Sequence, residues 1–154
     1  MAVTNLSGAD IIEVLELEPL PEEGGMWAQT WIDTRCTGIY FLMRPSDPSL
    51  LHRLSGPELW HHYLGAPAQL LLLHPDGAIE RPVLGTDLAA GHRPCVAVPP
   101  GTWMAAETTG AHTLVGTTMA PPYTDNGFEL GSQTNLLAAY PAASADIVRL
   151  TPAG

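Results

Sequence analysis

Lysine is absent from the 154 residues, so all six basic residues are arginines. Without lysine the chain has no P-loop lysine, no Schiff-base lysine and no lysine general base, which excludes those three kinds of site. Sixteen acidic residues bring the net charge to −10. Because such a surface repels phosphate backbones and anionic lipid headgroups, neither nucleic acid nor a membrane is expected as a partner.

Cysteine is scarce, and long apolar runs are missing. Cys36 and Cys95 form no Cys-x-x-Cys pair and are expected to be free, buried thiols. No apolar run approaches the length of about eighteen residues that a membrane helix needs, and no signal-like segment opens the chain. We therefore expect a cytoplasmic protein. The motifs of serine hydrolases, zincins and dinucleotide-binding enzymes are also missing.

Glycine and proline, in contrast, are abundant. Fifteen of each are spread along the chain, and 45% of the residues are hydrophobic. Many short elements joined by tight turns are typical of an all-β sandwich or barrel. The length fits one domain, so residues 1–154 are interpreted as a single domain.

The pattern of apolar residues predicts a helix, a series of strands and two terminal helices. Ser7 can cap a helix over 9–17, which Pro19 and Pro21 end. Short helices are predicted over 133–140 and 145–150. The predicted strands are 26–33, 37–43, 58–64, 69–73, 79–84, 95–98, 103–107 and 113–119.

Two spacings of residues point to a family. His52 is followed by Glu58 after five residues and by Gly65 after six more, and a later segment runs from Pro99 to Met104. These spacings resemble the two cupin motifs, G-x5-H-x-H-x(3,4)-E-x6-G and G-x5-P-x-G-x2-H-x3-N. Leu54 stands at the position of the second histidine of the first motif. Met104 stands at the position of the histidine of the second motif.

Longer segments strengthen the resemblance. The stretches PEEGGMWAQTW, GIYFLM, HRLSGPELWHHYLG, LLLHPDG and VAVPPGTW are similar to the small single-domain cupins of the Cupin-5 group, a domain of unknown function. The similarity implies an all-β fold, a cupin jelly-roll β-barrel with an N-terminal helix and short C-terminal helices. It also implies a homodimer, because such barrels leave an apolar outer sheet for a second copy.

The residues at the motif positions argue against a metal cofactor. Cupin metals are normally held by three histidines and a carboxylate, and only His52 and Glu58 remain here. His62 lies about 13 Å along a strand from Glu58, which is too far to share an ion. Met104 is a poor partner for a carboxylate-bound hard ion. We therefore expect no metal and no other cofactor.

Eight residues are candidates for the site. His52 is expected to act as a base, with Glu58 as its orienting partner or as an acid. A structural pair that only fills the barrel is the alternative. His61 is a third catalytic candidate, although strict alternation sends it to the face opposite Glu58 unless a β-bulge intervenes. The expected substrate-binding residues are Tyr40, Trp60, His62, Trp103 and Met104.

Three functions stay open at this point. The first is a metal-independent isomerase, epimerase or lyase that moves a proton on a small oxygenated substrate. The second is a barrel that binds a small molecule without turnover. The third is a metal-dependent dioxygenase or decarboxylase built on His52, Glu58 and waters.

Overall fold

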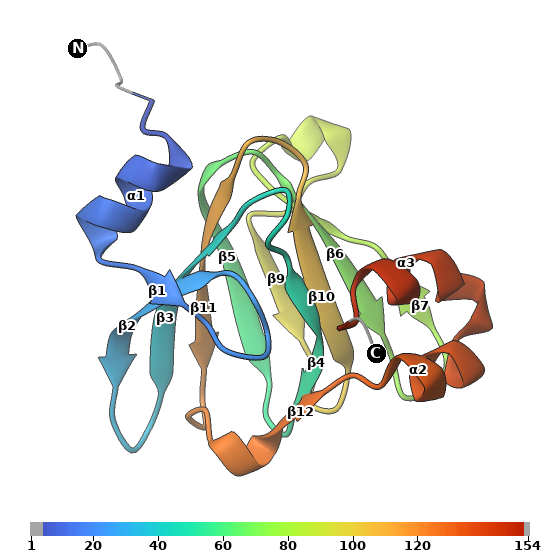
Figure 1. The fold of residues 1–154 in the computed structure, drawn as a ribbon. Helices are drawn as coiled ribbons and strands as arrows, with labels where there is room; N and C mark the ends of the chain where they lie inside the picture. The colour runs from blue at the N-terminus through green and yellow to red at the C-terminus, as the bar shows by residue number, and fades with distance from the viewer. Residues whose placement is uncertain (1–4, 153–154) are drawn as a thin grey trace.

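The computed structural model describes residues 5–152, and it consists mainly of two antiparallel sheets that face one another (Figure 1). The first sheet contains, in spatial order, β1 (Glu18–Pro19), β2 (Met26–Ile32), β3 (Thr37–Met43), β11 (Thr113–Met119), β5 (Glu58–Gly65) and β9 (Cys95–Val98). The second contains β12 (Phe128–Leu130), β4 (Ser49–Leu54), β10 (Trp103–Thr108), β6 (Ala68–Leu73) and β7 (Ile79–Glu80), with β8 (Val83–Leu84) also paired to β6. The prediction of a jelly roll is confirmed.

Within residues 5–152, three α-helices complete the fold. They are α1 (Gly8–Leu15), α2 (Gln133–Ala139) and α3 (Ser144–Arg149). Ser7 caps α1 as predicted, and its side chain and that of Asp10 form a reciprocal capping box. No helix among residues 5–152 is long and apolar enough to cross a membrane.

The main difference from the predicted strands is an additional one, β4, which carries His52 and was not predicted. Its sequence, SLLHRL, contains no β-branched or aromatic residue, so local propensity does not mark it as a strand. A second error is the strand over 79–84, which is interrupted between β7 and β8. Pro82 lies in that gap, where its missing N–H cannot continue a ladder. The strands over 37–43, 95–98 and 113–119 are confirmed.

The space between the sheets is filled by apolar side chains from both of them. Phe41 and Val115 of the first sheet pack in one buried cluster with Leu70 and Met104 of the second. This core fills one end of the interior, and a cavity occupies the other end.

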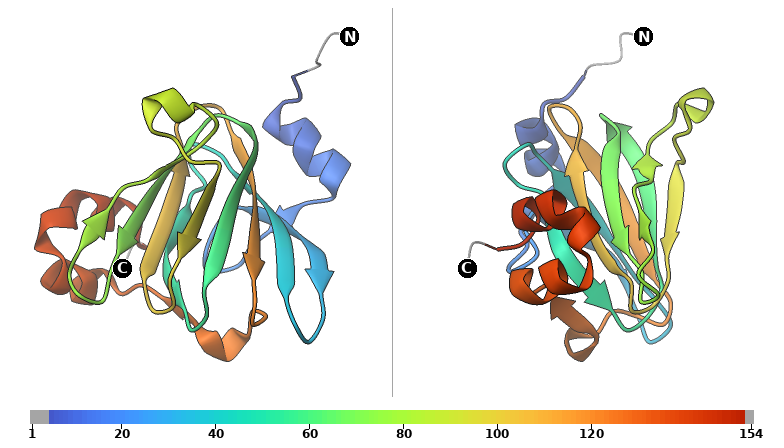
Figure 2. Two further views of the ribbon diagram at one scale, coloured as in Figure 1. Left: turned by 180° about the vertical axis from the view of Figure 1, so that it is seen from behind. Right: turned by 90° about the vertical axis from the view of Figure 1, so that its right-hand side faces the viewer.

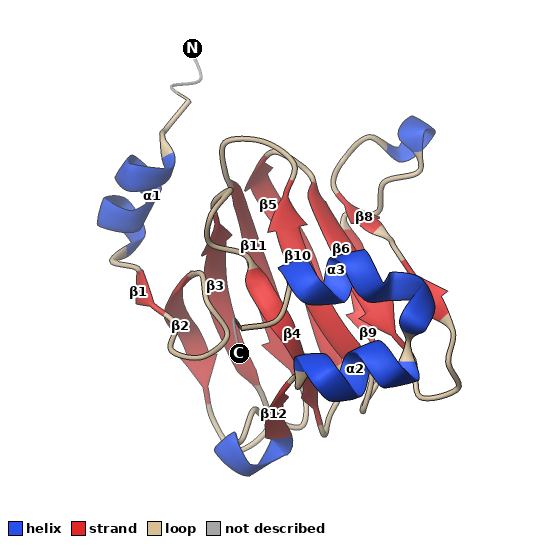
Figure 3. Cartoon of the chain, turned by 45° about the vertical axis from the view of Figure 1, so that its right-hand side comes forward, coloured by secondary structure: helices blue, strands red, loops and turns tan. Residues whose placement is uncertain are grey.

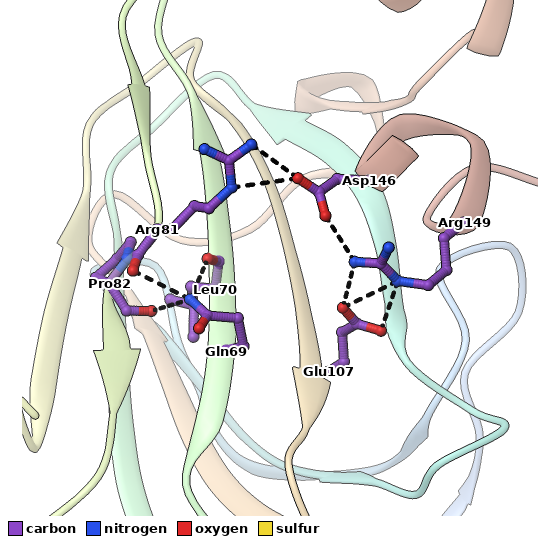
Figure 4. Close-up of polar contacts among 7 residues, drawn as sticks. All are labelled: Gln69, Leu70, Arg81, Pro82, Glu107, Asp146 and Arg149. Carbon is purple, nitrogen blue, oxygen red and sulfur yellow. Dashed lines mark hydrogen bonds and ion pairs between the residues drawn. The ribbon is translucent and has the colours of Figure 1, made fainter. Parts of the chain in front are cut away.

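Helices α2 and α3 lie over the outer face of the second sheet (Figures 2 and 3). Ile147 of α3 is fully buried against this face, together with Leu51 and Trp103. Polar contacts reinforce the packing, because Asp146 joins Arg81 and Arg149, and Arg149 also binds Glu107 of β10 (Figure 4).

Helix α1 covers only part of the outer face of the first sheet. Ile11 packs with Leu42 and Leu114, while Cys95 on edge strand β9 is exposed. The prediction that both thiols are buried is therefore wrong, since alternation along β9 turns Cys95 away from the core and Cys36 is only partly buried. Both cysteines are free, as expected.

Candidate functional site

A cavity of about 480 Å³ opens between the two sheets. Strands of both sheets, the loop between β1 and β2, and the loop between β11 and β12 contribute to its lining. Its volume is in the range of small-molecule sites. The lining side chains that carry polar or aromatic groups include Glu22, Glu23, Trp27, Gln29, Phe41, His52, Glu58, Thr117, Tyr123, Asp125 and Phe128.

The loop between β1 and β2 brings two carboxylates to the cavity. Gly25 has a φ of 75°, and a Cβ at this position would overlap the ring of Phe41, so only glycine fits. The loop is fixed to β4, because the Leu50 N–H donates to the Glu23 carbonyl at 2.8 Å. Glu23 therefore points toward β4, where Ser49 donates its hydroxyl proton to the carboxylate at 2.8 Å.

His52 is held in one orientation on β4 and is 1% exposed. Its Nδ1 lies 2.7 Å from the Leu50 carbonyl oxygen, which can only accept, so Nδ1 carries the hydrogen. The other nitrogen, Nε2, lies 3.5 Å from the Glu23 carboxylate. The ring stacks on Phe128 with centroids 5.5 Å apart. Proton exchange at His52 is therefore restricted to Nε2.

Glu58 on β5 is the second buried titratable group of the cavity, with 8% of its surface exposed. Burial, followed by the negative charge of Glu23, raises the pKa of the Glu58 carboxyl to about 8, and contacts with Thr117 and Trp60 oppose this weakly. The carboxyl group is therefore mostly protonated at neutral pH. A protonated carboxyl can donate a proton, which an ordinary surface glutamate cannot do at this pH.

The expected partnership of His52 and Glu58 needs one correction. Both line the cavity, but the carboxylate that faces Nε2 of His52, at 3.5 Å, belongs to Glu23. Sequence reasoning missed Glu23, since two glutamates in a PEEGG turn are indistinguishable from solvent-exposed turn residues. The available signal was the pair of glycines that follows them, which marks a loop with an unusual backbone.

His61 does not line the cavity, which corrects the proposal of a catalytic role. Its Nε2 lies 3.3 Å from the Thr118 hydroxyl, and its ring stacks on Tyr63 on the outer face of the sheet. A β-bulge does occur in β5, between the partners of Leu114 and Val115. It lies beyond His61 along the strand, so alternation from Glu58 to His61 remains undisturbed.

The expected substrate-binding residues are likewise placed outside the cavity lining. Tyr40 packs near α1 on the outer face of the first sheet, and Trp103 lies in the cluster beneath α2 and α3. Trp60 and Met104 point inward but are buried in the core next to the cavity, each 1% exposed. His62 contacts the Ala66 carbonyl at 3.2 Å, toward the far end of β5 from Glu58.

The residues at the motif positions do not fit a cupin metal. Leu54 and Met104 occupy two ligand positions with side chains that cannot serve a hard ion, and both are buried apolar groups. No group of three or more His, Cys, Asp or Glu side chains within residues 5–152 converges on a common point suited to a metal.

Comparisons with known proteins agree with this architecture. The family described as Cupin superfamily (DUF985) matches residues 9–131. A solved structure from Shewanella oneidensis is 33% identical with a TM-score of 0.90, covering 97% of this chain and 100% of that one. A hypothetical protein from Leishmania major is 26% identical with a TM-score of 0.86, covering 95% of this chain and 99% of that one.

More distant similarity concerns the fold alone. Oxalate decarboxylase from Bacillus subtilis is 12% identical with a TM-score of 0.60, covering 100% of this chain and 41% of that one. No curated protein shows a significant sequence match. The family match and the agreement along nearly the whole length of the Shewanella protein have one consequence: the chain belongs to the Cupin_5 (DUF985) family of the cupin superfamily.

Proposed function

We propose that the protein is a metal-independent isomerase, epimerase or lyase that moves a proton on a small oxygenated substrate in the cavity. One observation carries the proposal: a histidine with a single free nitrogen and a carboxyl group with a pKa of about 8 are buried in the same cavity. Two groups with such different environments are suited to the roles of base and acid.

The proposed roles follow from the contacts. Nε2 of His52 takes a proton from the carbon next to a substrate carbonyl, and Glu23 at 3.5 Å stabilises the imidazolium that forms. Glu58 donates its proton to the carbonyl oxygen as the enol develops. The imidazolium then returns a proton to carbon, and the Glu58 carboxylate takes a hydroxyl proton back from the enol, which restores both groups and completes an isomerisation or an epimerisation. Loss of a leaving group from the neighbouring carbon would complete an elimination, so the three reaction classes share this first step.

The test is exchange of substrate hydrogen with solvent. Small aldoses, ketoses and amino sugars are incubated with the protein in D₂O, and loss of the C–H signal is followed by NMR. His52→Asn and Glu58→Gln should each slow exchange by roughly 100-fold or more, the usual contribution of a general acid or base. Glu129→Gln is the matched control, since Glu129 lies outside the cavity and pairs with Arg53. A substrate that binds without exchange would instead support a non-catalytic binding protein.

We also propose a homodimer formed through the outer face of the first sheet. This face presents Leu59, His61, Tyr63 and Thr118, of which Leu59 and Tyr63 are 39% and 52% exposed. None of these side chains is acidic, although the chain carries a net charge of −10. Two copies that repel one another elsewhere can therefore meet here, and paired copies of one chain are the commonest arrangement.

Light scattering at micromolar concentration should give twice the mass of 16.4 kDa for the unmodified protein. Leu59→Asp should shift the mass to that of the monomer, because it would bury an unpaired charge in the contact. Leu88→Asp is the control, since Leu88 is 61% exposed in the short 3-10 helix Leu88–Ala90, which is not part of either sheet. A monomeric parent protein, or a dimeric Leu59→Asp variant, would contradict the proposed contact.

A further inference from the structure

The cavity contains several carboxyl groups and no fixed positive charge. Four of the described residues that line it are acidic, none is an arginine, and His52 is the only basic side chain among them. Inside the cavity the Glu23 carboxylate lies 3.5 Å from Nε2 of His52, and the Glu58 carboxyl keeps its proton near neutral pH. The interior of the cavity therefore offers no strong site for an anion.

The rim of the cavity adds negative charge that nothing offsets. Glu22 and Asp125 are exposed, and neither forms an ion pair with any of residues 5–152. The charges of both residues reach Tyr123. Burial, followed by the charge of Asp125, raises the pKa of the Tyr123 hydroxyl to about 12, and the charges of Glu23 and Glu22 add to the shift. Because Glu22 and Asp125 also line the same cavity, the two loops that carry these carboxylates meet around one entrance.

Aromatic rings form the remaining contact surface. Trp27 and Phe41 from the first sheet line one side, and Phe128, stacked on His52, lines the other. Tyr123 lies next to Phe128 at the entrance, with centroids 6.4 Å apart. An aromatic face attracts an organic cation, and the attraction is stronger where water is excluded. An aromatic cavity with an acidic entrance is thus complementary to a positively charged organic molecule.

We propose that the ligand of this cavity is a small organic cation, a molecule with a protonated amine on an oxygenated body. The ammonium group lies between the aromatic rings and the carboxylates of Glu22 and Asp125, and the oxygenated end reaches His52 and Glu58. Carboxylates, phosphates and nucleotide-linked sugars are disfavoured by the same charges. The binding of such a cation does not depend on the proposed function. Only its reaction in the cavity rests on that proposal.

Benzylamine, benzyl alcohol and benzoate are the probes, because they share one ring and differ in charge. Binding is measured at pH 7 by isothermal titration calorimetry and by the fluorescence of Trp27 and the other tryptophans. Benzylamine should bind about tenfold more tightly than benzyl alcohol, with benzoate weakest, since cation–π contact and two rim charges together suffice for a factor of this size. Raising the salt concentration should weaken only the amine.

The variant Glu22→Gln/Asp125→Asn removes the rim charges without touching the buried side chains. It should lose most of the preference for benzylamine and leave the affinity for benzyl alcohol unchanged. Equal or tighter binding of benzoate by the parent protein would overturn the proposal. So would an unchanged amine preference in the double variant, or no binding of benzylamine at about 20 mM, a concentration that detects even millimolar affinity.

Glu58→Gln and His52→Asn separate this inference from the proposed function. Both variants should retain the amine preference of the parent protein, because the Gln side chain copies the neutral carboxyl and the rim charges remain. Amine binding without any hydrogen exchange would defeat the catalytic proposal and leave the ligand class intact. Conversely, exchange catalysed on a neutral or anionic substrate alone would defeat the ligand class and leave the catalytic proposal intact.

Discussion

Glu58→Gln should increase the free energy of unfolding at pH 9 by on the order of 4 kcal/mol and leave it nearly unchanged at pH 4. The reason is the carboxyl pKa, which is about 8 in the folded protein against a model value of 4.5. Between these two values the folded state holds more protons than the unfolded state, so the stability of the parent protein falls as pH rises. Gln copies the protonated form at every pH and removes this loss.

The measurement is urea unfolding of both proteins at pH 4, 6, 7 and 9. The difference between them should open above pH 4.5, grow until about pH 8 and then stay constant, because above the folded pKa both states are ionised. Glu129→Gln is the control, as its carboxylate is exposed and paired with Arg53. Parallel stability curves for the parent and Glu58→Gln would show that Glu58 is not held in a protonated form.

This result would also bear on function. A substitution that stabilises the protein while it abolishes proton exchange would show that Glu58 is retained at an energetic cost. Residues kept in an unfavourable environment are typical of functional sites, where activity and stability are in conflict. A purely structural pair that fills the barrel would behave in the opposite way, since removing one partner would destabilise the fold.

Ile147→Ala should decrease the free energy of unfolding by about 3 kcal/mol, the usual cost of a cavity at a buried aliphatic position. Ile147 is fully buried where α3 packs on the second sheet, in the same cluster as Leu51 of β4 and Leu73 of β6. Loss of its side chain leaves a void that the rigid sheet cannot close. Thermal or urea unfolding at neutral pH measures the effect.

Val148→Ala is the matched control for Ile147→Ala. Val148 is the next residue of α3 but is 57% exposed, so its truncation should change stability by less than about 0.5 kcal/mol. Similar losses in the two variants would mean that α3 is not packed as described. Neither substitution removes a partner of the salt bridges that join Asp146 to Arg81 and Arg149. The comparison of the two variants therefore isolates the contribution of apolar packing to stability.

Alternation along β5 follows from the local sequence alone. In ELWHHYLG, side chains at every second position share a face, so Glu58 and Trp60 had to point one way and Leu59 and His61 the other. The motif spacing likewise predicted that His52 and Glu58 belong to one barrel interior, and the family segments predicted the jelly roll. Each of these inferences depends on local periodicity or on similarity along the chain.

The groups that meet around His52, in contrast, depend on how distant segments of the chain pack together. Glu23 precedes His52 by 29 positions and reaches it through a loop whose path depends on Gly25 and on packing over Phe41. Asp125, from the loop between β11 and β12, lies at the same entrance. Burial and the charge of Glu23 then raise the pKa of Glu58. Contacts between distant segments leave no periodic trace in the sequence, because they depend on how loops close over a finished core.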